Sequence, residues 1–199
     1  MADSPEALSL SAFKHVVFPI GIVTALGVAR IVAAASTYIQ HRPRVHYSFG
    51  HALWGAVLFL WFIVLWWIVW GFRHVAADVW SVFTLIFLMM GPALMYLATT
   101  LHLPELPEDG HLDLAERFER FGRPFFLCLA GFILWLTLTE VWLLREPWIT
   151  LPKRGIQASV LTLLLIGARF PDRRTTTVLG MIVLLVVAFG LATVRATLA

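Results

Sequence analysis

The stretch "LWFIVLWWIVWGFRH", from Leu60 to His74, contains four tryptophans and no charged residue before Arg73. It belongs to an apolar run long enough to cross the roughly 30 Å hydrocarbon core of a bilayer as an α-helix. Over the 199 residues, hydrophobic residues make up 60% and charged residues 14%, and the mean hydropathy is +0.84. A soluble domain carries more charge than this. The sequence therefore predicts an all-α, polytopic transmembrane helical bundle.

Apolar runs of similar length recur along the chain and predict one transmembrane domain over residues 1–199. About six spans are expected, at roughly 16–40, 50–72, 80–102, 124–144, 154–170 and 175–195. The fifth is the shortest, because only 14 residues separate Arg154 from Arg169. At 1.5 Å per residue they make about 21 Å of helix. If 154–170 is a re-entrant segment, five spans remain.

The longest connection, "LPELPEDGHLDLAERFERFGRP", runs from Leu103 to Pro124. Its first half is acidic and proline-rich, which is typical of a loop. In its second half Asp113 and Glu116 have the spacing of a capping box, and apolar residues then recur at helical intervals. This pattern predicts a short interfacial amphipathic helix near 113–122. The alternative is a continuation of the fourth span, broken at Gly122 and Pro124.

The tryptophans of the opening stretch lie close to one predicted boundary. Trp66, Trp67 and Trp70 precede Arg73 directly, and indole prefers the depth of the lipid headgroups. An interfacial belt is therefore expected on that side. Trp61 and Trp135 fall near the middle of their spans, where packing within the bundle or against lipid is expected.

Arg30 lies deep in the first predicted span. An arginine at the bilayer centre costs at least about 2.5–3.5 kcal/mol, so it should have a partner inside the protein or in water. Glu140 is the acidic residue within a predicted span, but it lies nearer the opposite boundary. Tyr96 and Thr99 are closer to Arg30 in depth and are the expected hydrogen-bond partners. These four residues are the candidates for a polar route through the membrane.

Two further patterns concern helix packing. Gly91 and Pro92 interrupt the third span, where proline removes a backbone donor and predicts a kink or hinge. Small residues every four positions in the first span predict close approach of another helix, within the chain or between copies. These are Gly21, Ala25, Ala29 and Ala33.

His51 begins the second span and His102 ends the third on the same side, so the two side chains are expected to approach each other. A bis-imidazole haem site requires such a pair, and interfacial histidines are the alternative. The sequence has no zinc-ligand pattern, phosphate-binding loop or nucleophile elbow, so neither an enzyme nor another cofactor or metal is expected. A net charge of +3 gives no reason to expect a nucleic-acid partner.

The small-residue first span, the Trp–Trp-rich second span, "YLATTLHLPE" and "LAERFERFGRPFF" together resemble a group of uncharacterised bacterial polytopic inner-membrane proteins. The resemblance covers most of the first 140 residues and implies a bacterial inner-membrane location. Eight basic residues fall in connections on the side away from the N-terminus and six on the N-terminal side. By the positive-inside rule both termini are then expected outside.

Three functional hypotheses follow. The first is a small ion or solute transport or channel-type protein with a polar route near Arg30. The second is a non-catalytic scaffold or accessory subunit that associates with itself or with another membrane protein. The third is a haem-binding electron-transfer bundle that uses His51 and His102.

Overall fold

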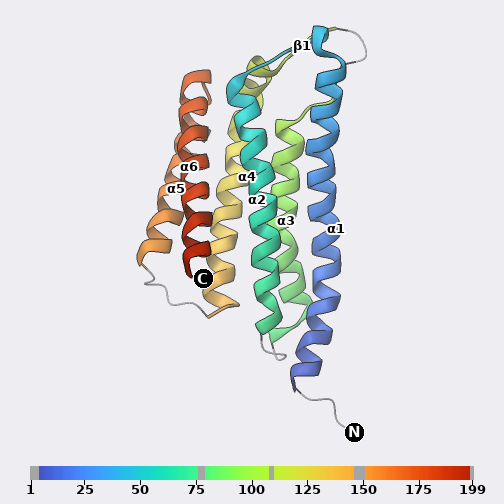
Figure 1. The fold of residues 1–199 in the computed structure, drawn as a ribbon, viewed down its shortest axis with the longest axis vertical. Helices are drawn as coiled ribbons and strands as arrows, with labels where there is room; N and C mark the ends of the chain where they lie inside the picture. The colour runs from blue at the N-terminus through green and yellow to red at the C-terminus, as the bar shows by residue number, and fades with distance from the viewer. Residues whose placement is uncertain (1–4, 76–78, 108–109, 146–150, 198–199) are drawn as a thin grey trace.

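The computed structural model describes residues 5–75, 79–107, 110–145 and 151–197. Within these ranges the chain forms an upright bundle of six α-helices (Figure 1). They are α1 (Pro5–Gln40), α2 (Phe49–Gly71), α3 (Val82–His102), α4 (Leu114–Trp142), α5 (Leu151–Arg169) and α6 (Arg173–Thr197). The predicted all-α helical bundle is confirmed, and α1 begins and α6 ends toward the same end of it (Figure 1).

Among the described residues, four helical stretches are long and apolar enough to cross a membrane. They are Phe13–Gln40, Phe49–Gly71, Val82–His102 and Leu114–Trp142. The protein is therefore an integral membrane protein. Helix α5 does not turn back partway: it runs antiparallel to α4 toward the end where α4 begins, and α6 returns beside it (Figure 1). Because α5 and α6 are not among the four stretches above, the choice between six spans and five stays a prediction.

Helix α4 is longer than its predicted span. Asp113 caps it by accepting hydrogen bonds from the backbone N–H groups of Ala115 and Glu116. The helix then continues without interruption through Gly122 and Pro124. A separate interfacial helix near 113–122 is therefore wrong. The alternative, a continuation of the fourth span, is correct, but the helix is not broken at Gly122 or Pro124. Proline removes one backbone bond, and buried phenylalanines on both sides of it keep the two halves packed against the bundle.

The bundle core is rich in aromatic side chains. Trp61 and Trp135 are buried in it, as packing within the bundle requires. The indole Nε1 of Trp135 donates a hydrogen bond of 2.7 Å to the carbonyl of Phe87 on α3. A Cβ atom on Gly91 would come within 2.4 Å of that indole. Glycine at position 91 thus lets α3 and α4 pack closely, and α3 continues through Pro92 as one helix.

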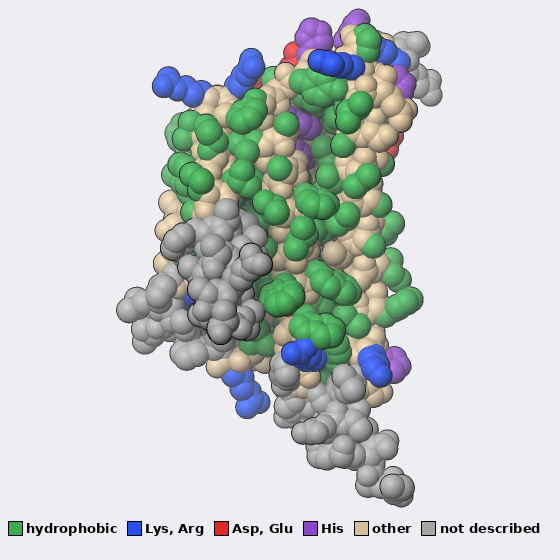
Figure 2. Space-filling view, in the orientation of Figure 1, with side chains coloured by type: hydrophobic (Ala, Val, Ile, Leu, Met, Phe, Trp, Pro, Cys, Tyr) green, Lys and Arg blue, Asp and Glu red, His purple; other side chains and the backbone are tan. Residues whose placement is uncertain are grey.

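Two short strands join the connections at one end of the bundle. Strand β1 (Val45–His46) follows the 3₁₀ helix η1 (Arg42–Arg44) and pairs in parallel with β2 (Leu112–Asp113). Val45 lies opposite Leu112, and His46 lies opposite Asp113. The ladder fastens the α1–α2 connection to the α3–α4 connection. We call this the histidine end, because histidine side chains gather there (Figure 2).

We call the opposite end the tryptophan end. The indoles of Trp66, Trp67 and Trp70 are exposed there, and the Arg73 guanidinium lies 4.7 Å from the Trp70 ring centroid. The chain turns through the 3₁₀ helix η2 (Phe72–His74) at this end. Exposed indole beside a cation suits the headgroup depth.

Candidate functional site

The imidazoles of His51 and His102 lie in contact at the histidine end. Their ring centroids are 3.9 Å apart and their planes differ by 16°. His51 is in the first turn of α2 and His102 is the last residue of α3, so the expected approach of the two side chains occurs. They are 5% and 2% exposed. Phe118 and Phe125 of α4 surround the pair, with centroids 5.3 Å and 5.0 Å from that of His102.

Each ring is fixed by a hydrogen bond to the backbone of the other residue. Nε2 of His51 lies 2.7 Å from the carbonyl oxygen of His102, and Nε2 of His102 lies 2.9 Å from that of His51. The carbonyls of a helix C-terminus have no partner within the helix, so the His51 ring satisfies one of them at the end of α3. The two helices are thereby held at a fixed relative depth.

These bonds determine which nitrogens carry protons. A carbonyl oxygen only accepts, so Nε2 of each neutral ring must be the donor and Nδ1 the acceptor. Two imidazolium rings 3.9 Å apart in apolar surroundings would repel each other strongly, and the geometry fits uncharged rings. Nδ1 of His102 is buried without a hydrogen-bond partner. Nδ1 of His51 likewise has no partner among the described residues, and its ring borders a cleft.

The same geometry bears on haem binding. A bis-imidazole haem needs two ring nitrogens that point at one iron from opposite sides. Here the rings lie face to face, so their nitrogen lone pairs do not converge, and both Nε2 atoms are engaged by carbonyls. The pair does not fit a haem ligand set in this arrangement. Among the described residues there is also no group of three or more histidine, cysteine, aspartate or glutamate side chains that could hold a metal ion.

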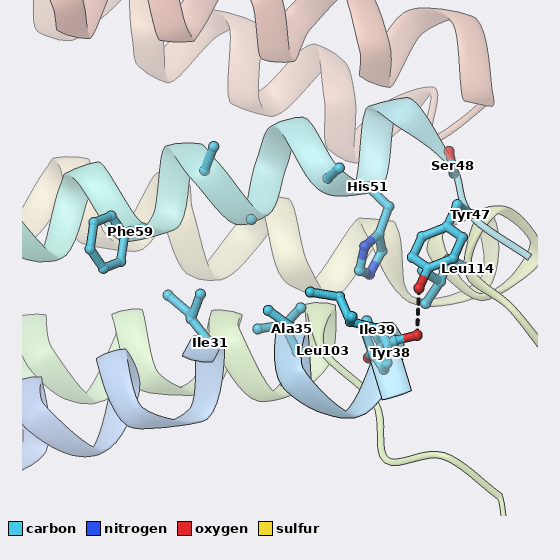
Figure 3. A pocket seen from close by; sticks show the side chains of 13 residues that line it. Ile31, Ala35, Tyr38, Ile39, Tyr47, Ser48, His51, Phe59, Leu103 and Leu114 are labelled. Carbon is cyan, nitrogen blue, oxygen red and sulfur yellow. Dashed lines mark hydrogen bonds between the residues drawn. The ribbon is translucent and has the colours of Figure 1, made fainter. Parts of the chain in front are cut away.

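The cleft beside His51 lies between α1 and α2 and encloses about 350 Å³ (Figure 3). The cleft exists because small side chains leave this part of the α1–α2 contact unfilled: Ala35 on α1 faces a run of small residues on α2. The lining residues are Ile31, Ala35, Tyr38, Ile39, Tyr47, Ser48, His51, Ala52, Gly55, Ala56, Phe59, Leu103 and Leu114. Several of them, including Ile39 and Phe59, are exposed on the flank of the bundle. In Figure 2 histidine atoms are visible at the floor of a recess on this face.

Two tyrosines close the inner part of the cleft near His51. The Tyr38 hydroxyl donates to the carbonyl of Pro104 at 2.7 Å. The Tyr47 hydroxyl donates to the carbonyl of Tyr38 (Figure 3). Both hydroxyl protons are therefore committed to the protein's own backbone. The Tyr38 ring centroid lies 6.3 Å from that of His51.

Arg30 does not line this cleft. Its Nη1 is 3.0 Å from Oε1 of Glu105, and its Nη2 donates to the carbonyl of Leu103 at 3.2 Å. The hydroxyl of Thr99 instead donates to Met95, and Tyr96 lies at the bundle surface. The partner of Arg30 is thus Glu105 in the α3–α4 connection, in place of the hydroxyls that the sequence suggested. The pair borders a small second cavity of about 110 Å³.

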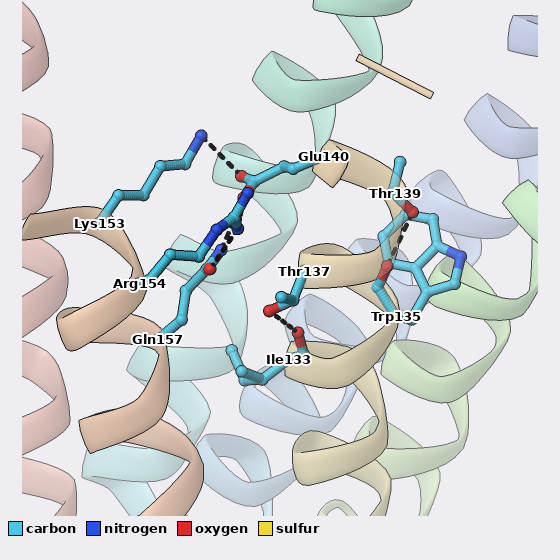
Figure 4. A network of polar contacts seen from close by, with 8 residues as sticks. All are labelled: Ile133, Trp135, Thr137, Thr139, Glu140, Lys153, Arg154 and Gln157. Atoms are coloured by element: carbon cyan, nitrogen blue, oxygen red, sulfur yellow. Dashed lines mark hydrogen bonds and ion pairs between the residues drawn. The ribbon is translucent and has the colours of Figure 1, made fainter. Parts of the chain in front are cut away.

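Glu140 lies near the tryptophan end and joins α4 to α5 (Figure 4). The residue is 4% exposed. Oε1 lies 2.9 Å from Nζ of Lys153, and Oε2 lies 2.7 Å from Nη1 of Arg154. Nε2 of Gln157 donates to Oε2 at 2.8 Å. Arg30 and Glu140 therefore belong to separate clusters near opposite ends of the bundle, and the structure does not bring them together.

The small-residue stripe of α1 is used only in part within this chain. Gly21 faces α2, where an added Cβ would lie 3.6 Å from the Trp66 ring. Ala25, Ala29 and Ala33 are exposed on the outer side of α1. The predicted packing of these three against another helix or another copy stays a prediction.

Sequence reasoning did not select the residues that complete the cleft. Tyr38, Tyr47 and the facing alanines fall in a helix end, a connection and an apolar run, and none of them forms a motif. A usable signal did exist: small residues in "AAAS" (33–36) and "HALWGA" (51–56) flank the turn between the first two spans. Facing small residues in adjacent helices leave either a close contact or a gap, and here they leave a gap.

No protein-family model, curated protein or solved structure matches this chain. Its function is therefore argued from the site.

Proposed function

We propose that this integral membrane protein binds an amphipathic molecule taken from the lipid phase, with the apolar tail in the α1–α2 cleft and the headgroup at His51. The observation that carries the proposal is the His51 ring, which lines a mostly apolar cleft of about 350 Å³ and whose Nδ1 accepts no hydrogen bond from the described residues. That volume lies within the range of about 300–1,000 Å³ typical of small-molecule sites. A ligand that donates a hydrogen bond would satisfy this acceptor.

The headgroup should carry no net charge. None of the residues that line the cleft is Lys, Arg, Asp or Glu. A charged headgroup would lose its hydration there without gaining a counter-charge. Arg30 does not supply one, because it faces the second cavity and pairs with Glu105. The cleft thus favours neutral amphiphiles over anionic phospholipids.

The transport hypothesis lacks comparable support. It requires polar groups that continue across the bundle, yet three buried threonines in the described core donate to their own helices. Thr24, Thr99 and Thr139 bond to the carbonyls four residues before them. A scaffold role remains the alternative, for which the outward-facing alanines of α1 offer a surface. On the resemblance and the basic residues alone, we also propose a bacterial inner-membrane location with both termini outside.

A cleft-filling substitution tests the proposal. Ala56 lines the cleft on α2, whereas Ala93 is an exposed alanine on α3 that borders neither cavity. We expect a diazirine-bearing long-chain alcohol, in nanodiscs of zwitterionic lipid, to label cleft residues such as Ile39 in the wild type. The Ala56→Trp variant should lose this labelling and the Ala93→Trp variant should keep it.

Mass spectrometry of the labelled peptides reads out the result, and thermal unfolding confirms that both variants fold. Labelling of cleft residues that persists unchanged in Ala56→Trp would mean that the probe reports only ordinary lipid contact. The proposal would then be abandoned.

A further inference from the structure

We infer that the headgroup bound at His51 is a hydroxylated aromatic ring, as in a hydroquinone with one apolar tail. This inference rests on the proposed function and names the class of ligand for the same cleft. It follows from the direction of the hydrogen bonds at the inner part of the cleft and from the rings that line it.

The His51 ring offers the cleft a hydrogen-bond acceptor that has no donor among the described residues. His51 uses its Nε2 proton on the carbonyl of His102, which leaves Nδ1 as an acceptor on a ring that lines the cleft. Tyr38 and Tyr47 have already committed their hydroxyl protons to backbone carbonyls. A ligand that pairs with Nδ1 must therefore donate, and a neutral amphiphile donates through a hydroxyl group.

The rings around this point favour an aromatic head over an aliphatic alcohol. Tyr38, Tyr47 and His51 all line the cleft at its inner part (Figure 3). The far face of the His51 ring is already covered by His102 at 3.9 Å. Aromatic rings attract one another in offset and edge-to-face arrangements beyond the effect of buried area alone. A planar head beside these rings gains both this attraction and the hydrogen bond.

The same reasoning separates two oxidation states of one ligand. A hydroquinone carries O–H donors, whereas the corresponding quinone carries only carbonyl acceptors. A quinone oxygen facing Nδ1 would place two acceptors together and leave both unsatisfied. The cleft should therefore prefer the reduced form, and no electron transfer is implied by this preference.

Four ligands with the same decyl chain test the inference: the hydroquinone, its dimethyl ether, the quinone and decanol. Binding is measured by calorimetry under argon, with the protein in phosphatidylcholine nanodiscs. We expect the hydroquinone to bind about tenfold or more tightly than each of the others, a factor that corresponds to about 1.4 kcal/mol. The ether tests the donor, the quinone tests the oxidation state and decanol tests the ring.

Two variants locate the effect. His51→Phe keeps a ring but removes Nδ1, and should reduce hydroquinone binding to the level of the dimethyl ether. His46→Phe is the matched control, because His46 is an exposed histidine at the same end that does not line the cleft. It should leave all four affinities unchanged. If His51→Phe does not fold, the comparison of the four ligands on the wild type still decides.

The two proposals fail in different ways. Equal binding of all four ligands would overturn the aromatic hydroxyl while leaving an amphiphile-binding cleft. Tighter binding of decanol than of the hydroquinone would have the same consequence. If none of the four binds, the proposed function fails together with the inference.

Discussion

The carboxylate of Glu140 should be the strongest single electrostatic contribution to the packing of α5 against the bundle. Replacing it by glutamine keeps an acceptor of nearly the same shape and removes the charge. Lys153 and Arg154 then lose the Glu140 charge at the α4–α5 contact (Figure 4). The perturbation therefore isolates the electrostatic part of this contact from its packing.

Exposure sets the expected magnitude. The Lys153 side chain is 40% exposed, so its pair with Glu140 should contribute no more than a surface pair, about 0–1 kcal/mol. The Arg154 and Glu140 side chains are 13% and 6% exposed. Removing one partner of a buried pair costs about 3–5 kcal/mol. Since glutamine still accepts a hydrogen bond, we expect a loss near the lower limit, about 3 kcal/mol.

Thermal unfolding in detergent measures this loss. For a chain of this size, 1 kcal/mol shifts Tm by about 2–4 °C, so Glu140→Gln should lower Tm by about 6–12 °C. Glu105→Gln is the matched control, because it removes a carboxylate from another arginine pair in which the glutamate is 82% exposed. Its loss should stay within about 1 kcal/mol. Similar Tm decreases in the two variants would refute the argument from burial.

Two further predictions concern the helices themselves. Gly91→Ala places a Cβ within 2.4 Å of the Trp135 ring and should lower the free energy of unfolding by about 1–3 kcal/mol. Gly71→Ala is the control, because a Cβ there has no atom within 4 Å and should not lower stability. Equal Tm values for the two variants would contradict this prediction. The backbone N–H of Glu116, bonded to the Asp113 carboxylate, holds the pKa of Asp113 below its usual 3.8. The cap therefore stabilises the fold above that pH and is lost as the pH falls through the folded value. Asp113→Asn should weaken this acid dependence of Tm, and an unchanged dependence would exclude the cap as its source.

The sequence predicted best the spans with polar residues at both ends. The expected ranges 50–72 and 80–102 compare with Phe49–Gly71 and Val82–His102. The approach of His51 and His102 followed from these boundaries. Their stacking and reciprocal hydrogen bonds did not, because these depend on the relative depth of α2 and α3 to within about an ångström. Hydrophobic periodicity carries no information on that scale.

The partners of Arg30 could not be predicted from its depth in the membrane, counted in residues along the first span. Helix α1 extends 36 residues from Pro5, and the chain after α3 runs beside it (Figure 1). Leu103 and Glu105 thereby reach the Arg30 guanidinium. The sequence held one clue, since Pro104 keeps this segment from continuing α3. Its path along α1 is set by tertiary contacts such as the Tyr38–Pro104 bond.

Glu140 illustrates the opposite case, in which the clue was present but not used. Lys153 and Arg154 lie just beyond the turn that follows the fourth span, on the same side of the membrane as Glu140. Antiparallel neighbours joined by a short turn bring such residues to one level. From the sequence alone, Glu140 was compared only with Arg30, the two were placed at different depths, and no partner for Glu140 was named. Proximity across the turn is the better guide here.

The ladder between β1 and β2 bears on the route by which a ligand could reach His51. It ties two connections across the histidine end, and Arg44 adds bonds to the carbonyls of Pro107 and Gly110. The cleft opens on the flank of α1 and α2 instead, so an amphiphile that binds there as proposed would enter in the plane of the bilayer. The occupancy of the cleft would then follow the mole fraction of the amphiphile among the surrounding lipids. Diluting the membranes in buffer should leave that occupancy unchanged.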